Sequence, residues 1–341
     1  GILPRKGMAQ LLRVAVTSAL FTLMALAPAP VLAQKMSAGE EALVIQTFEV
    51  TQHARDLFAA GEFDTAERMF REVVDLQRSS PFYSPLSLAA ALHNLATTLA
   101  ELGRLAEAEP LAQEALQLRE TNGAVANALV SSLQLLSSIQ NDLGQYAQAR
   151  QLSARAVELG LGGQGVDPAS LIRNIAALAY LTASDGDLEG GIALINQVVP
   201  MLGDLPPADV ARVINTVGRL TSMAGDPARA ETYYREAVAR SAQLAVSAEW
   251  NVADQATVLN NLAALLQQQG RLDEAEVLFT QANAALLASG FTANALRATV
   301  LDGLGEVARA RGLYREAFAF QSEALTIRLA SLPETHPAIG A

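Results

Sequence analysis

The feature that most constrains the fold of this chain is a glycine that returns at a nearly constant interval. The steps between successive members of the set are 42, 41, 42, 39, 45 and 42 residues. The set comprises Gly61, Gly103, Gly144, Gly186, Gly225, Gly270 and Gly312. An alanine follows each of them five residues later, except in the fourth copy, which has Gly191. A fixed period of this length predicts a stacked array of one small structural unit rather than a single globular core.

The sixth copy shows most clearly what the unit is. Before Gly270, apolar residues recur at helical spacing, namely Leu259, Leu262, Ala263 and Leu266. After the glycine a second stripe follows, with Leu272, Ala275, Leu278, Phe279 and Ala282. A glycine between two helices tolerates the left-handed conformation that ends the first of them. Each copy is therefore predicted to be a pair of helices joined by a tight turn, with small residues where the two backbones approach.

The order of large and small residues resembles the tetratricopeptide repeat, although the period is longer than the ~34 residues usual for that family. In the sixth copy the pattern falls on Leu259, Leu262, Ala263, Leu266, Ala275, Phe279 and Ala282. Phrases such as LNNLAALLQQQGRLDEAEVLF resemble the long-period repeats of kinesin light chains. The resemblance implies an all-α fold, a right-handed α-solenoid of about seven helix-turn-helix repeats. The fourth copy departs from the pattern, because Gly191 replaces the packing alanine.

The first 33 residues have the layout of a secretory signal peptide. After a plausible initiator at Met8, a short basic start at Arg13 leads into an apolar run over residues 14–27. Small residues then precede a cleavage point after Ala33. The apolar run is short for a helix that spans a bilayer. We therefore expect an exported protein, periplasmic or secreted. An uncleaved signal that anchors the chain in the membrane is the alternative.

The domain organisation that follows is a signal peptide at residues 1–33 and a repeat array at residues 34–341. The residues before Met8 are of doubtful origin, because a natural chain does not begin with glycine. At the other end, THPAI at residues 335–339 resembles the start of a further helix, so the array is expected to be truncated there. A naturally frayed end is the alternative. No segment after the signal peptide is apolar enough to cross a membrane.

Composition argues against several classes of function. The chain has 35 acidic and 24 basic residues, a formal net charge of −11, which disfavours binding to nucleic acid. It has no cysteine, so it has neither thiolate metal ligands nor a cysteine nucleophile. Its three histidines are not spaced as metal ligands, and no GxSxG motif occurs. We therefore expect no catalytic residues, no cofactor, no metal site and no enzymatic activity.

The resemblance implies that the first helices of the repeats line a concave groove for extended peptides or partner helices. The residues predicted to face this groove are Asn94, Arg173, Arg212, Asn215, Arg219 and Asn261. Amide side chains offer donors and acceptors to a peptide backbone, and a guanidinium suits a carboxylate. Arg212 and Arg219, with Asn215 between them, are expected to hold a carboxylate of the ligand. The alternative is that these arginines pair with acids of their own array.

These observations predict a protein–protein interaction scaffold or adaptor that binds a peptide or protein in its groove. Two other hypotheses remain open. In the first, the array is the targeting or regulatory region of a larger enzyme whose catalytic domain lies outside this sequence. In the second, it is a structural array that associates with itself end to end. Nothing in the sequence identifies the partner.

Overall fold

The computed structural model describes residues 38–81, 83–162, 166–244 and 250–331. The expected signal peptide, its cleavage point after Ala33 and the phrase at residues 335–339 lie outside these residues. Over the ranges that the structure describes, no helix has both the length and the apolar character needed to cross a membrane.

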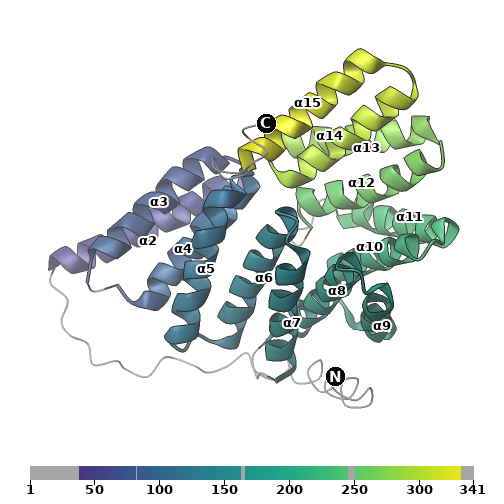
Figure 1. The fold of residues 1–341 in the computed structure, drawn as a ribbon. Coiled ribbons are helices and arrows are strands. Elements are labelled where there is room, and N and C mark those ends of the chain that lie inside the picture. The colour runs from purple at the N-terminus through teal and green to yellow at the C-terminus, as the bar shows by residue number, and fades with distance from the viewer. Residues whose placement is uncertain (1–37, 82, 163–165, 245–249, 332–341) are drawn as a thin grey trace.

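The described residues form fourteen α-helices and one short 3-10 helix, with no strand among them. Consecutive α-helices pair as α2 (Ala38–Ala59) with α3 (Phe63–Ser79), α4 (Pro85–Glu101) with α5 (Leu105–Thr121), α6 (Ala126–Asp142) with α7 (Tyr146–Gly162), α8 (Pro168–Ser184) with α9 (Leu188–Val198), α10 (Pro207–Met223) with α11 (Pro227–Leu244), α12 (Val252–Gln268) with α13 (Leu272–Ala288), and α14 (Ala295–Ala310) with α15 (Tyr314–Ser331). The 3-10 helix η1 (Val199–Asp204) follows α9. The predicted all-α, right-handed α-solenoid of about seven helix-turn-helix repeats is confirmed (Figure 1).

Each pair of helices turns at one of the periodic glycines. All seven have a positive φ, between 74° and 102°, a region that a residue with a Cβ rarely adopts. In the sixth repeat, the Gly270 amide donates to the Gln267 carbonyl and the Arg271 amide donates to the Leu266 carbonyl, both at 2.9 Å. These bonds satisfy carbonyls that the end of α12 would otherwise leave unpaired. Each periodic glycine therefore lies at the turn within a helix pair, as the sequence predicted.

The small residues of the pattern set how closely the paired helices pack. Ala263 on α12 and Ala275 on α13 are fully buried, and Phe279 fills the space beside them. First helices also contact the first helices of neighbouring repeats, as α8 does with α10 and α12 with α14. Second helices contact mainly the helices next to them in sequence. The first helices therefore form the inner, concave side of a curved array, and the second helices form its outer side (Figure 1).

The fourth repeat shows why one glycine replaces a packing alanine. A Cβ added to Gly191 on α9 would lie 2.5 Å from the carbonyl oxygen of Ala179 and 3.0 Å from the Cβ of Ala183, both on α8. The two helices of this repeat therefore pack more closely than an alanine allows. α9 is also the shortest α-helix of the described array, and η1, with Pro200 near its start, continues from it. The departure at Gly191 is a local adjustment within the repeat fold.

Replacing Gly191 with alanine is expected to destabilise the protein, although alanine is the better helix former by about 1 kcal/mol. The added methyl group would press on the backbone of α8, which cannot move aside as a flexible side chain can, and overpacking of this kind costs about 1–3 kcal/mol. Urea denaturation followed by circular dichroism measures the net change. Gly162→Ala is the control, because its added Cβ meets nothing within 4 Å. Equal or greater stability of Gly191→Ala would contradict the close packing.

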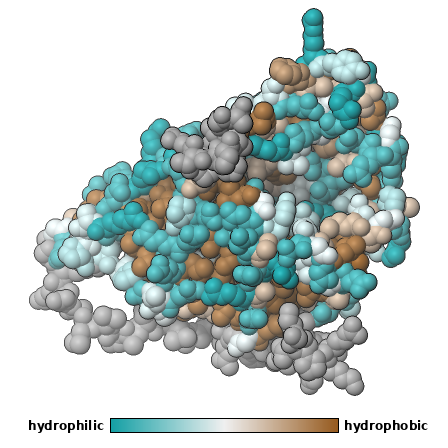
Figure 2. Space-filling view, in the orientation of Figure 1, coloured by the Kyte–Doolittle hydropathy of each residue, from teal (hydrophilic) through white to brown (hydrophobic). Residues whose placement is uncertain are grey.

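The surface of the array is mainly hydrophilic, with separate hydrophobic residues between the polar ones on the face shown in Figure 2. The last helix is an exception. On α15 the side chains of Tyr314 and Phe318 are 72% and 74% exposed, and Leu325 is 54% exposed. One stripe of α15, the last helix among the described residues, is therefore exposed.

The array curves until its first repeat touches the loop that joins its sixth and seventh repeats. Phe63 at the start of α3 and Phe291 in the loop between α13 and α14 pack edge to face, with ring centroids 4.9 Å apart. In Figure 1 the turn between α2 and α3 lies toward the upper middle of the view, beside the yellow helices of the seventh repeat. The concave side therefore faces the interior of one closed turn of helices.

Candidate functional site

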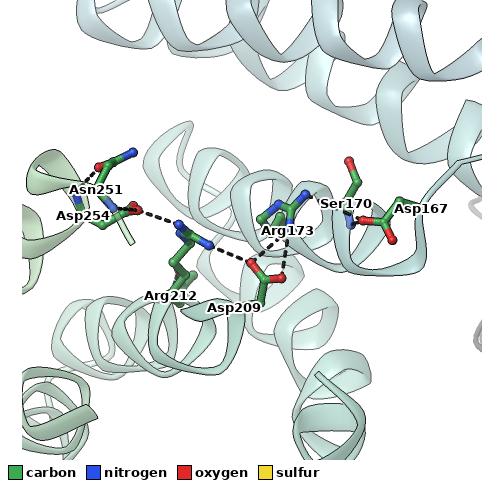
Figure 3. Close-up of polar contacts among 8 residues, drawn as sticks. Asp167, Ser170, Arg173, Asp209, Arg212, Asn251 and Asp254 are labelled. Carbon is green, nitrogen blue, oxygen red and sulfur yellow. Dashed lines mark hydrogen bonds and ion pairs between the residues drawn. The ribbon is translucent and has the colours of Figure 1, made fainter. Parts of the chain in front are cut away.

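A row of ion pairs crosses the concave side of the fourth, fifth and sixth repeats. Its centre is Asp209 in the first turn of α10, whose side chain is almost fully buried. The Arg173 guanidinium on α8 donates to both oxygens of this carboxylate, at 3.0 and 2.8 Å, and Arg212 donates to one of them at 2.8 Å. One carboxylate therefore serves two arginines that come from adjacent repeats (Figure 3).

The row extends beyond Asp209 on both sides. Arg212 also donates to Asp254 in the first turn of α12 at 2.6 Å, and Asp254 forms a capping box with Asn251. At the other end, Arg173 lies 3.8 Å from Asp167, the residue that caps α8. Acids at helix starts are favoured by the helix dipole, so the row uses positions that also stabilise the helices. We call Asp167, Arg173, Asp209, Arg212 and Asp254 the ion-pair row.

A second set of polar contacts consists of paired amides on the same first helices. Asn261 on α12 donates to the side-chain oxygen of Asn215 on α10 at 3.0 Å. Gln134 on α6 donates to the side-chain oxygen of Asn174 on α8 at 2.6 Å. Asn174 is 2% exposed, and its side-chain amide nitrogen has no hydrogen-bond partner among the described residues. A buried donor without an acceptor is costly, so this nitrogen is a ready contact for a ligand oxygen.

Arg219 is the arginine of this face that lacks an acidic partner. Its guanidinium lies 3.3 Å from the centroid of the Tyr180 ring, and it forms no ion pair within the described ranges. Burial lowers the pKa of Arg219 from its ordinary value, and the hydroxyls of Tyr180, Tyr234 and Tyr146 offset part of that effect. An arginine stays charged nevertheless. The concave side of an acidic protein therefore holds a half-buried positive charge that lies against a tyrosine ring rather than an acid.

Two cavities open on either side of the Arg219–Tyr180 pair. The first has a volume of about 390 Å³, and its lining includes Ser138, Asn174, Tyr180, Arg212 and Arg219. The second has a volume of about 220 Å³ and shares Tyr180 and Arg219 with the first. The repeat register explains this arrangement. Tyr180 and Arg219 each lie six residues before a turn glycine, and Ser138 and Ala264 hold that position in the neighbouring repeats. The large pair thus stands between two small residues, which leave space on both sides.

Four of the six residues predicted for the groove line these cavities. Arg173, Arg212 and Arg219 line the first, and Arg219 and Asn261 line the second. Asn215 is buried against Asn261, so it does not lie open between Arg212 and Arg219. Asn94 is half-buried on α4 and lines neither of these two cavities.

Sequence reasoning missed the acids and one amide that define the site. Asp209 and Asp254 neutralise Arg173 and Arg212, and Asn174 supplies the unpaired donor. Asp209 precedes Arg212 by one helical turn, which was the available signal for one of these pairs. Nothing local marked Asp254 as a partner of Arg212, because the two residues belong to different repeats.

Among the residues that the structure describes, no group of three or more His, Asp or Glu side chains is arranged to hold a metal ion. The acids of the ion-pair row, Asp167, Asp209 and Asp254, are engaged with arginines. The chemistry that the site offers is recognition by hydrogen bonds and charge.

Comparison with known families identifies the repeat. A family model described as tetratricopeptide repeat matches residues 46–121, 87–161 and 254–330, which together are more than half of the chain. A second model with the same description matches residues 210–245. The matches include both ends of the described array.

Individual relatives share the repeats rather than a whole protein. Over 100 residues the chain is 40% identical to the cellulose synthase operon protein C of Xanthomonas axonopodis pv. citri. This match covers 29% of the chain and 6% of that protein.

Solved structures share the fold. The Rap conjugation gene regulator of the plasmid pLS20, solved in complex with a peptide, has a TM-score of 0.63 at 14% identity over 98% of this chain and 89% of the regulator. A kinesin light chain with nearly identical repeats from Podospora anserina has a TM-score of 0.50 at 19% identity, over 59% of this chain and 97% of that one. The predicted likeness to kinesin light chain repeats is confirmed at the level of the fold.

Proposed function

The chain belongs to the tetratricopeptide repeat family, and we propose that it is a non-catalytic scaffold that binds an acidic peptide segment on its concave side. The observation that carries this proposal is Arg219, a half-buried guanidinium that lacks an acidic partner among the described residues and borders two cavities. A carboxylate of the partner supplies the negative charge that the described residues of the array do not offer to Arg219.

The contacts around Arg219 specify the mode of binding. A ligand carboxylate on Arg219 makes charge-assisted hydrogen bonds, which are about twice as strong as neutral ones. The unpaired amide nitrogen of Asn174 donates to a backbone carbonyl of the same segment. Arg212 and Arg173 contribute less, because Asp209 and Asp254 already neutralise them. The acid-binding role predicted for the arginines of this groove therefore concentrates on Arg219.

An extended peptide fits this surface better than a compact small molecule. The polar groups follow one another across α8, α10 and α12, so that a chain crossing the repeats meets each of them in turn. The Rap regulator of similar fold was solved with a peptide, which supports this choice of ligand class. The net charge of the chain, −11, opposes an acidic partner at long range, so the attraction proposed here comes from the local positive charge of Arg219.

A random dodecapeptide library tests the proposal. We expect selected peptides to contain an Asp or Glu, and to bind Arg219→Met about tenfold more weakly than the parent chain, a change of ~1.4 kcal/mol. Trp250 is the only tryptophan and contacts Arg212, so its fluorescence follows binding on this side. Arg235→Met is the control, because Arg235 is exposed and pairs with Glu231 and Glu274 on the second helices. Selected peptides without acids, or equal binding by both variants, would overturn the acidic-peptide proposal.

We propose further that the protein is exported, and that it is periplasmic or secreted. The support is the basic and apolar segment that ends at Ala33. The intact mass of the protein recovered from its native host is expected to correspond to a chain that begins at Gln34. A membrane-bound product that keeps residues 8–33 would favour an anchor instead.

Self-association is the second candidate function, and it is favoured by the exposed stripe on α15. Tyr314 and Phe318 are more than 70% exposed, whereas aromatic side chains usually bury much of their area. Sedimentation equilibrium separates the two candidates, because an array that acts by self-association is expected to be oligomeric and Phe318→Ser to be monomeric. A parent chain that is monomeric at every concentration tested would exclude this second candidate.

A further inference from the structure

The loop between α13 and α14 is in contact with the first repeat, more than 200 residues away in the chain. Atoms of Ser289 and Gly290 lie against the turn at Gly61 so closely that neither glycine has room for a side chain. A Cβ added to Gly61 would lie 2.3 Å from the Ser289 carbonyl oxygen, and a Cβ added to Gly290 would lie 2.0 Å from the Gly61 carbonyl oxygen. Backbone meets backbone at this point.

The same loop also meets the second repeat. A Cβ added to Gly103 would lie 1.8 Å from the Ala293 carbonyl oxygen. The next residue, Asn294, hydrogen-bonds through its side chain to Glu101 at the end of α4. Burial raises the pKa of Glu101 to about 7, with a smaller contribution from Asp142 and an opposing one from Asn294. The contacts of Ala293 with Gly103 and of Asn294 with Glu101, which is half-buried, show that the loop covers the end of α4.

Aromatic packing completes the contact. Phe291 of the loop stacks edge to face on Phe63, whose ring in turn lies 5.1 Å from that of Phe58. Phe63 is 3% exposed. The loop thus contributes one aromatic side chain to a small apolar cluster that otherwise belongs to the first repeat.

These contacts are not a general property of the repeat. The turn glycines of the other five repeats have the same positive φ, yet a Cβ added to any of them would meet nothing within 4 Å. The set is Gly144, Gly186, Gly225, Gly270 and Gly312. Of the seven periodic turn glycines, Gly61 and Gly103 are therefore the two that also approach a distant segment closely.

We propose that residues 289–294 are a clasp, which closes the array into a ring and opens to release it as a spiral. In an array in which each repeat contacts only its neighbours, curvature is the sum of small rotations and is easily changed. A single contact between the two ends removes that freedom. The clasp is small compared with the core of the array, so it opens at a lower free energy than unfolding requires.

Opening the clasp is expected to change the curvature of the concave side. The helices between the two contact points include α6 to α12, which carry the ion-pair row and both cavities. Their curvature is fixed while the clasp is closed and is free to relax when it opens. The proposal is independent of the identity of any ligand, because it concerns the array itself.

A cross-linking experiment tests the clasp. The chain has no cysteine, so Glu62→Cys and Thr292→Cys introduce the only two thiols, both at exposed positions beside the contact. A short bismaleimide is expected to join them within one chain in high yield. Adding Gly290→Ala is expected to lower the rate of cross-linking about tenfold and to raise the radius of gyration in small-angle scattering, because its Cβ would displace the Gly61 backbone.

A matched control separates the clasp from backbone strain. Gly123 lies in the equivalent connection between α5 and α6 and has φ +68°, close to the +84° of Gly290, but an added Cβ there meets nothing within 4 Å. Gly123→Ala is therefore expected to cross-link like the parent. If Gly290→Ala does not fold, as judged by circular dichroism, Gly103→Ala with Gly144→Ala as its control replaces the pair. Equal cross-linking by the test and control variants, or none in the parent, would overturn the proposal.

Discussion

Asp209→Ala is expected to lower the free energy of unfolding by about 2–3 kcal/mol, below the ~3–5 kcal/mol typical of a broken buried ion pair because both arginine partners are partly solvated. The Asp209 side chain is 3% exposed and binds Arg173 and Arg212 at once. Removing it leaves two guanidiniums facing each other across α8 and α10, with like charges and no shared acceptor. Urea denaturation followed by circular dichroism measures the loss.

The control for Asp209→Ala is Asp302→Ala. Asp302 also pairs with an arginine, Arg328, but both side chains are 40% exposed or more. An exposed pair is worth ~1 kcal/mol or less, so this variant is expected to remain close to the parent. Equal losses for the two variants would mean that the ion-pair row contributes no more to stability than an ordinary surface pair.

Arg297→Met is expected to lower the free energy of unfolding by about 2–4 kcal/mol, because it removes the three hydrogen bonds that a buried guanidinium donates. Arg297 is 6% exposed and donates to the Asn283 side chain at 3.1 Å and to the Thr292 carbonyl at 2.5 Å. It also pairs with Glu323 on α15. Methionine keeps much of the side-chain volume but none of the hydrogen-bond donors. The loss in the free energy of unfolding therefore measures the contribution of the hydrogen bonds.

The Thr292 carbonyl belongs to the clasp, and this gives Arg297→Met a second expected result. Without its bond to Arg297 the loop is less well held, and cross-linking between the introduced cysteines at positions 62 and 292 is expected to slow. Arg309→Met is the control, since Arg309 is 60% exposed and, among the described residues, its ion pair is with Glu306 of its own helix. A variant that loses stability but cross-links at the parental rate would show that Arg297 supports the sixth and seventh repeats without positioning the clasp.

The repeat fold was predictable because its signals are local. A turn glycine, an alanine five residues later and apolar residues at helical spacing all act within about 30 residues, and each repeat carries them independently. Where one copy departs from the pattern, the reason is a contact within that copy, as the close approach of Gly191 to Ala179 shows.

The candidate site was predictable only in part. The register of the repeats placed Arg173, Arg212 and Arg219 on the same face, and all three line the first cavity. Apart from Asp209, one helical turn before Arg212, their sequence surroundings did not separate Arg219 from the other two. That difference depends on Asp209 and Asp254 reaching Arg173 and Arg212 from neighbouring repeats, and on Tyr180 covering Arg219 instead of an acid.

By itself the sequence determined that this protein is a stack of helical pairs, because a pair is stabilised by residues close together in the chain. The tertiary structure alone decided that the stack closes on itself. Closure joins Gly61 to Gly290, and it depends on small rotations that accumulate over the repeats between them. No residue encodes such a sum, so the same turn glycine is only a turn at Gly144 and is both a turn and a contact at Gly61.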